Sequence, residues 1–274
     1  MPFCLVHQVN VHYEIHGEGI PILMIHGFTP DMKLMKGCME PIFSIRKGFQ
    51  RIYIDLPGMG KTGHYHHLKN AEEILDIVIG FIDTMIQDQP FLIVGESYGG
   101  YLTKGVLAKR GERVRGAAFI CPVVVPNASD RTLPPHSIVY KDERFLKQLT
   151  MEEREEFSRD LVILNEYSWN RYKNEIKAGC QLADEPFLQK IAKQYSFTFP
   201  VTQMMYEFPA IFLLGKQDSV VGYKDALDLI DQFPRATYAI VDEAGHNLQI
   251  EQREIFDTLI HDWLNRVTEN RMEV

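Results

Sequence analysis

The chain has 274 residues, 45% of them hydrophobic and 24% charged, which is enough for a sizeable core in one or two domains. Its net charge of -8, without a long basic stretch, argues against nucleic acid as a partner. No apolar run is long enough to span a membrane, and residues 1–7 do not resemble a secretory signal. The four cysteines are scattered, which favours free thiols in a reducing cytoplasm.

Strands and helices are expected to alternate along the first part of the chain. Residues 3–16 predict the start of a β-hairpin, followed by a turn at 17–19. Buried strands are then expected at 21–25, 50–54, 90–94 and 114–121, and helices at 31–45, 70–86 and 100–109. This alternation indicates an α/β fold, with a mostly parallel central sheet and helices on both of its faces.

The alternation stops at Pro122. Residues 123–206 carry many charges and aromatic side chains, contain no convincing buried strand, and show helical spacing in several stretches. The earlier rhythm returns with strands expected at 210–214 and 237–241, and helices at 223–233 and 248–267. The sequence therefore predicts a core made of residues 1–122 and 207–274, with a helical insertion at 123–206.

The pentapeptide Gly95-Glu96-Ser97-Tyr98-Gly99 lies between a predicted strand and a predicted helix. G-x-S-x-G in this context is typical of a nucleophile elbow, a tight turn that strains the serine backbone and lifts its hydroxyl above the sheet edge. A Cβ at either glycine is expected to clash across the turn. The alternative is an ordinary serine in a glycine-rich turn.

A nucleophilic serine needs a base, and the base needs an orienting acid. Asp218 and His246 each follow a predicted strand, so both are expected at the same edge of the sheet as Ser97. Asp242 and Glu243 are competing acids, but they stand too near His246 in the sequence to reach the far side of its ring easily. We therefore predict a catalytic triad of Ser97, Asp218 and His246.

The chain order of this serine, acid and histidine resembles that of the α/β-hydrolase family, and the likeness covers the whole chain. His26-Gly27-Phe28 resembles the family's H-G-x segment, and residues 55–62 resemble its structural D-x-x-G-x-G-x-S loop, with Thr62 in place of the serine. The resemblance implies an oxyanion hole formed by the backbone N–H groups of Phe28 and Tyr98. His26 is expected to anchor its loop, and Glu96 to be a buried, hydrogen-bonded acid without a catalytic role.

Other motifs carry less weight. Residues 58–63 match the dinucleotide-binding fingerprint and nearly match a P-loop, but no apolar helix follows, and Asp55 stands where a P-loop requires glycine. The histidines at 64, 66 and 67 have no partner at metal-ligand spacing and are interpreted as part of a solvated loop. No metal and no cofactor are expected.

The predicted reaction is hydrolysis of a small, hydrophobic ester or related acyl compound through an acyl-enzyme on Ser97. The aromatic insertion would roof the site, with Trp169 and Tyr172 either lining the pocket or packing within the insertion. Carbon–carbon bond hydrolases, proline iminopeptidases and cofactor-free haloperoxidases of the same family remain open, as does a ligand receptor with a vestigial triad. We expect kcat/KM to rise with pH through His246 and to level near neutrality. The oligomeric state is not predicted.

Overall fold

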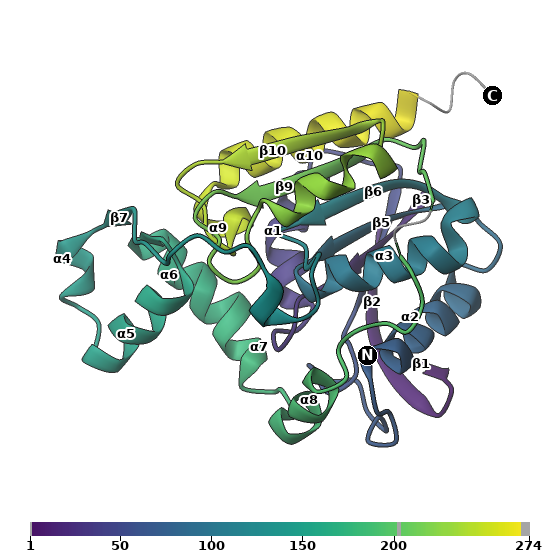
Figure 1. Ribbon diagram of the computed structural model, residues 1–274, viewed down its shortest axis with the longest axis horizontal. Helices are drawn as coiled ribbons and strands as arrows, with labels where there is room; N and C mark the ends of the chain where they lie inside the picture. The colour runs from purple at the N-terminus through teal and green to yellow at the C-terminus, as the bar shows by residue number, and fades with distance from the viewer. Residues whose placement is uncertain (1, 202–203, 270–274) are drawn as a thin grey trace.

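The computed structural model describes residues 2–201 and 204–269 and is built around one eight-stranded sheet (Figure 1). The strand order is β1-β2-β4-β3-β5-β6-β9-β10. β1 pairs antiparallel with β2, β2 pairs antiparallel with β4, and the other neighbours are parallel. The strands are β1 Phe3–Val6, β2 Val9–His16, β3 Ile20–Ile25, β4 Phe49–Ile54, β5 Phe91–Glu96, β6 Val114–Ile120, β9 Ala210–Gly215 and β10 Ala236–Val241. The predicted α/β class and mostly parallel sheet are confirmed.

Helices cover both faces of this sheet. α2 (Ala71–Met85) and α3 (Tyr98–Arg110) lie together on one face, and α1 (Lys33–Phe43) and α10 (Arg253–Glu269) lie on the other (Figure 1). No helix among the described residues combines the length and the apolar character needed to cross a membrane.

Local sequence explains where these helices begin. Asn70 precedes α2, and its side chain accepts the backbone N–H of Glu73 at 2.8 Å, which satisfies one of the free donors of the first turn. The apolar positions of α2 recur at helical spacing and are buried against the sheet and α3.

Two helices near the carboxyl terminus differ from expectation. The segment predicted as a helix over 223–233 forms a 3-10 helix, η4 (Asp225–Gln232). The last predicted helix is divided into α9 (Leu248–Glu251) and α10, because Gln252 between them has the non-helical angles φ -126 and ψ 54.

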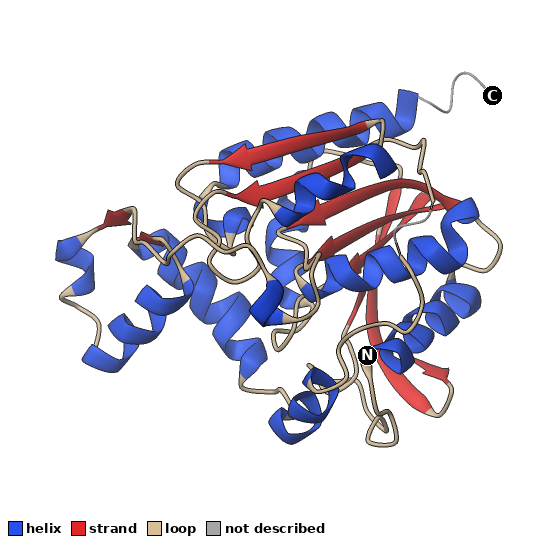
Figure 2. Cartoon of the chain, viewed as in Figure 1, coloured by secondary structure: helices blue, strands red, loops and turns tan. Residues whose placement is uncertain are grey.

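Residues 123–206 connect β6 to β9 and consist largely of short helices (Figure 2). Two very short parallel strands, which the sequence did not indicate, also occur there. Residues 202–203 of the predicted insertion, and residues 1 and 270–274 of the predicted core, lie outside the described residues. The elements are η2 Ala128–Asp130, β7 Tyr140–Lys141, α4 Glu143–Leu146, α5 Met151–Asp160, β8 Ile163–Leu164, α6 Glu166–Arg171, η3 Tyr172–Lys177, α7 Ala178–Cys180 and α8 Glu185–Ala192.

The carboxyl ends of β5, β6, β9 and β10 point toward the side of the molecule that carries this insertion (Figure 1). The insertion has its own apolar cluster, which includes Phe157, Trp169 and Tyr172 and reaches Leu34 of α1 and Ile250 of α9. It is therefore packed against the core beside the sheet edge at which parallel-sheet sites form. The division into core and insertion at 123 and 206 stays a prediction.

The turn between β5 and α3 is closely packed. A Cβ on Gly99 would lie 2.1 Å from the carbonyl oxygen of Ile25, at the end of β3. We predict that Gly99→Ala destabilises the fold by more than about 2 kcal/mol, because the clash is with backbone that cannot rotate away. Gly63→Ala is the control, since a Cβ there meets no atom within 4 Å. Urea unfolding midpoints of both variants would test this, and equal midpoints would contradict it.

Candidate active site

Ser97 occupies the turn between β5 and α3 in a strained conformation, with φ 52 and ψ -112. Its N–H donates to the carbonyl of Ile120 at 2.9 Å, and its carbonyl accepts the N–H of Val123 at 3.0 Å. A Cβ on Gly95 would lie 2.3 Å from the carbonyl oxygen of Gly99, across the turn as expected. A Cβ on Gly99 would instead clash with Ile25 at the end of β3, so at this glycine the clash is not across the turn. The predicted elbow geometry is therefore present.

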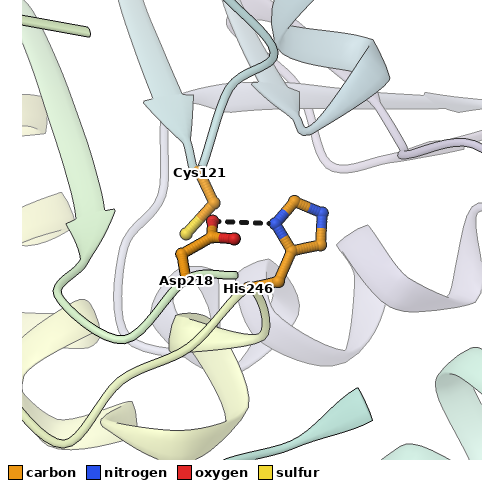
Figure 3. A group of neighbouring side chains, drawn as sticks. All are labelled: Cys121, Asp218 and His246. Carbon is orange, nitrogen blue, oxygen red and sulfur yellow. Dashed lines mark hydrogen bonds and ion pairs between the residues drawn. The ribbon is translucent and has the colours of Figure 1, made fainter. Parts of the chain in front are cut away.

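Ser97, His246 and Asp218 form a continuous hydrogen-bonded chain. His246 Nε2 lies 2.9 Å from Ser97 Oγ, and His246 Nδ1 lies 2.9 Å from Asp218 Oδ2. Figure 3 shows the second of these bonds, between side chains from the loops that follow β9 and β10. With Asp218 accepting from Nδ1–H, Nε2 is free to accept the serine proton.

His246, helped by two backbone N–H donors, lowers the pKa of the buried Asp218 carboxyl. Asp218 is fully buried, and its Oδ1 accepts the N–H groups of Val220 and Val221 at 2.9 and 3.0 Å. Burial alone would raise the pKa of this carboxyl, but His246 and the two N–H donors lower it below its usual value. The competing acids Asp242 and Glu243 are both exposed.

The charge state of His246 depends on the groups around it. Burial by itself lowers the pKa of its imidazole, but the hydrogen-bonded Asp218 and the nearby Glu96 raise it, and the net pKa lies above that of ordinary histidine. The Arg131 guanidinium works in the opposite direction.

Glu96 lies directly beneath this arrangement. It is buried, its Oε1 is 3.7 Å from His246 Nε2, and among the described residues its Oε2 has no hydrogen-bond partner. Burial raises the pKa of Glu96 to about 7, against the favourable charge of His246. Glu96 is buried as expected, but within the described chain the expected hydrogen bond is not found at its Oε2. Its position next to His246 means that it influences the protonation of that imidazole.

The loop after β3 lies against the elbow. A Cβ on Gly27 would be 3.3 Å from Ser97 Cβ, and the ring of the next residue, Phe28, meets the ring of Tyr98 edge-on at 5.2 Å. His26 holds this loop, since its Nδ1 lies 2.8 Å from Gly27 O and its Nε2 accepts the N–H of Leu56. The two predicted oxyanion-hole residues are thus neighbours of each other, and Phe28 lines both cavities together with Ser97.

The loop of residues 55–62 supports the same region through the Asp55 side chain. Its Oδ1 accepts the N–H of Met32, and its Oδ2 accepts the N–H of Lys61 and contacts His12 Nδ1 at 2.7 Å. Thr62 donates its hydroxyl to Asp55 O at 2.6 Å, as a serine there would. No helix begins between Asp55 and the start of α2 at Ala71, so the helix that a dinucleotide fingerprint requires directly after its glycines is missing from this described segment.

Two cavities meet at Ser97, Phe28, Val220 and His246. The small cavity, of about 200 Å³, extends toward the insertion and α1 and is lined further by Gly27, Thr29, Pro30, Leu34, Glu96, Asp160, Ile176, Cys180 and Asn247. The large cavity, of about 670 Å³, is lined further by Val123, Pro126, Asn127, Ala128, Arg131, Ala192, Lys193, Tyr195, Ser196 and Val221. Ser97 therefore stands where two differently lined cavities join.

Trp169 and Tyr172, proposed from the sequence as pocket candidates, line neither of these two cavities. Trp169 packs edge-on against Phe157 within the insertion, and Tyr172 donates its hydroxyl to Asp160 at 2.7 Å. The structure therefore supports the alternative that both residues pack within the insertion. Tyr195 lies in the large cavity instead, and its ring lies 5.9 Å from the ring of Phe28.

Sequence reasoning missed the contribution of Glu251. Its carboxylate accepts the N–H groups of Val162, from the insertion, and of Gly245, next to His246, each at 2.6 Å. It therefore fastens the histidine loop to the insertion. Burial raises the pKa of Glu251 to about 7. Its sequence signal was weak, because it is one of several acids near the start of the last helix.

Cys121 lies beside Asp218 and His246, and the three together resemble a possible metal-ligand group (Figure 3). Their donor atoms lie within 4.8 Å of one another. The Cys121 thiol donates to Gly245 O at 3.6 Å, and burial raises its pKa well above the usual value. Asp218 and His246 are already hydrogen-bonded to each other. These contacts favour the proton-transfer arrangement over a metal site.

Comparison with known proteins identifies the family of the chain. The family model described as serine aminopeptidase, S33, matches residues 21–253. Pimeloyl-[acyl-carrier protein] methyl ester esterase of Legionella pneumophila (strain Paris) is 21% identical over 93% of this chain and 100% of its own length, and 2-hydroxymuconate semialdehyde hydrolase of Pseudomonas putida is 26% identical over 94% and 91%. The crystal structure of an α/β superfamily hydrolase from Oenococcus oeni PSU-1 superposes with a TM-score of 0.88 and 29% identity, covering 98% of this chain and 100% of that one. The chain therefore belongs to the serine aminopeptidase, S33, family of α/β hydrolases.

Proposed function

We propose that this protein is a serine esterase that hydrolyses a small ester through an acyl-enzyme on Ser97. The hydrogen-bonded chain from Asp218 through His246 to Ser97, with both distances at 2.9 Å, is the observation that carries the proposal. The cavities that meet at Ser97 give a substrate access to the hydroxyl. The names of the esterase and hydrolase relatives also support it.

In the proposed mechanism, His246 Nε2 accepts the proton of Ser97 as Oγ attacks the ester carbonyl. The N–H groups of Phe28 and Tyr98 hold the developing oxyanion, and loss of one such donor costs about 3 to 4 kcal/mol in a well-studied case. The alcohol leaves with the proton from His246. Water then attacks the acyl-enzyme while His246 Nε2 accepts its proton. The bond between the acyl carbon and Ser97 Oγ breaks, the carboxylic acid leaves, and His246 returns the proton to Ser97 Oγ.

An ester fits the cavities better than an aminopeptidase substrate, which needs a free carboxylate to bind its ammonium group. The carboxyl-bearing residues that line the two cavities are Glu96 and Asp160. Glu96 is buried beneath Ser97, and Asp160 is already bonded to the Tyr172 hydroxyl and to Arg159. Asp160 is thus already paired and Glu96 is not exposed, so neither offers an open, unpaired carboxylate to an amine.

The proposal also covers the role of the insertion, the partners and the cellular location. Residues 123–206 act as a cap that controls substrate choice, and the substrate is a small molecule, with neither nucleic acid nor membrane as a partner. A cytoplasmic location is supported by the four cysteines, all of which are free thiols.

A substrate panel tests the proposal: esters of graded chain length, aminoacyl amides and vinylogous diketones, each at the same concentration. Multiple turnovers on the esters and slower turnover on the other two classes are expected. A single slow turnover would identify a ligand receptor, and preferential turnover of the diketones would identify a carbon–carbon bond hydrolase.

We predict that Ser97→Ala lowers kcat by about 10⁴-fold or more, because the residual rate would come only from the oxyanion hole and binding. A fluorophosphonate should label the unmodified protein at Ser97 alone, since only a hydroxyl coupled to histidine is strongly nucleophilic. Mass spectrometry reports the label. A folded Ser97→Ala protein with full activity would disprove the assignment.

We predict that Asp218→Asn lowers kcat by about 10³- to 10⁴-fold, because an amide favours the wrong imidazole tautomer. Glu243→Gln is the matched control, since Glu243 is exposed and close to His246 in sequence. The steady-state kcat values of the two variants should differ by orders of magnitude, with equal helix content showing that both are folded. A larger loss in Glu243→Gln would identify the other acid.

We predict that kcat/KM rises with pH through a midpoint above about 6.5, the ordinary histidine pKa, so that the plateau lies above neutrality. The base must be neutral, and Asp218 and Glu96 stabilise its charged form. Glu96→Gln should move the rising limb to lower pH, because a neutral amide no longer favours the imidazolium. A limb that stays in place, or moves upward, would show that Glu96 does not act on His246.

A further inference from the structure

The large cavity is lined by two cationic side chains, Arg131 and Lys193, and by no aspartate or glutamate. The whole chain carries a net charge of -8, so this local excess of positive charge runs against the overall balance. Among the described residues, no carboxylate lies within 4.0 Å of either cation, in contrast to the ion pairs formed by many other cations of the molecule.

Arg131 is held rigidly although its charge is unpaired. Its Nε donates to Val125 O at 2.9 Å, its Nη1 to Val220 O at 3.1 Å and its Nη2 to Pro126 O at 3.1 Å. A guanidinium has five N–H donors, so these three bonds fix its plane and leave two donors unused by them. A half-buried cation that is satisfied only by carbonyl oxygens remains a binding site for an anion.

Lys193 reaches the same space from a distant part of the sequence. It follows α8 as its carboxyl-terminal cap residue, it is exposed, and no hydrogen bond to another described residue holds its ammonium group. Ala192 and Tyr195 beside it line the same cavity. A flexible cation next to a fixed one is suited to a charged group that extends away from Ser97.

We propose that the substrate of this enzyme carries a carboxylate, which binds to Arg131 and Lys193 in the large cavity while the scissile ester bond lies at Ser97. The inference rests on the proposed esterase function and names its substrate class: a half-ester of a dicarboxylic acid, or a similarly anionic acyl compound.

The lining of the small cavity determines which way round the substrate binds. Its ionisable lining residues include Glu96 and Asp160, and its apolar ones include Leu34 and Ile176. Carboxyl groups repel a second carboxylate, so the anionic part of the substrate is directed to the large cavity. The small cavity receives the short, uncharged part, and its volume of about 200 Å³ fits a small group.

The test compares two p-nitrophenyl esters of adipic acid that differ only in charge: one with a free distal carboxylate, the other with that carboxylate methylated. We expect kcat/KM for the anionic ester to exceed that for the neutral one by about 10-fold or more, the effect of a hydrogen bond to a charged group. Arg131→Gln should reduce this ratio to about one, and Lys193→Gln should reduce it by about 2- to 5-fold, as for an exposed cation. Added salt should lower the ratio.

Lys190→Gln is the matched control, because it removes the same charge from α8 at a residue that lines neither cavity at Ser97 and donates to His66 O. It should leave the ratio unchanged. A wild-type ratio of one or less, or a ratio that neither Arg131→Gln nor Lys193→Gln alters, overturns the proposal.

Calorimetry on the Ser97→Ala protein separates this inference from the esterase function. Monomethyl adipate should bind more tightly than dimethyl adipate, and Arg131→Gln in the same background should abolish the difference. If neither p-nitrophenyl ester is hydrolysed, the esterase function fails. The calorimetric comparison then still decides whether the cavity selects an anion, and equal affinities would refute it.

Discussion

The close approach of the elbow to the end of β3 is the constraint on which the rest of the site depends. A Cβ on Gly99 would lie 2.1 Å from Ile25 O, and one on Gly27 would lie 2.3 Å from Glu96 Oε2. Only hydrogen atoms fit between these segments. The serine and the loop that carries Phe28 are therefore positioned by close packing, against backbone at Gly99 and against the buried Glu96 side chain at Gly27. Pre-organisation of this kind is what an oxyanion site requires.

Three buried or partly buried carboxyls surround the histidine loop, and their environments shift their pKa values in different directions. Asp218 accepts two backbone N–H groups and His246, and its pKa is lowered. Glu96 and Glu251 are less well compensated, and burial raises the pKa of each to about 7. Ionisation of Asp218 and Glu96 favours a charged imidazole at His246, whereas Arg131 opposes it. The same guanidinium therefore acts on the base and, in our proposal, on the substrate.

The parts that could be predicted from sequence depend on short-range chemistry. The elbow follows from two glycines around Ser97, and the convergence of Asp218 and His246 follows from their places after parallel strands. Apolar spacing over eight residues could not distinguish the 3-10 helix η4 from an α-helix. The break at Gln252 lies next to Glu251, whose carboxylate accepts the N–H of Val162 from the insertion, a tertiary contact that the local sequence does not show.

The lining of the site was the least predictable part, because it depends on tertiary contacts between segments that are distant in the sequence. Trp169 was a pocket candidate because aromatic residues suit a roof, yet it packs against Phe157 inside the insertion. Arg131 and Lys193 meet in one cavity only because the chain returns to the core after α8. Composition cannot reveal such a meeting, since each cation taken alone resembles any solvated residue.

The position of Cys180 affects how chemical probes of this enzyme are to be read. Its thiol lines the small cavity and lies 3.3 Å from the hydroxyl of Thr29, whereas the other three cysteines are buried. Burial also raises the pKa of the Cys180 thiol, so alkylation there is slow. A maleimide that reached it would fill the cleft and stop turnover by obstruction. Inactivation by a thiol reagent would therefore mimic a cysteine hydrolase in an enzyme whose chemistry we assign to a serine.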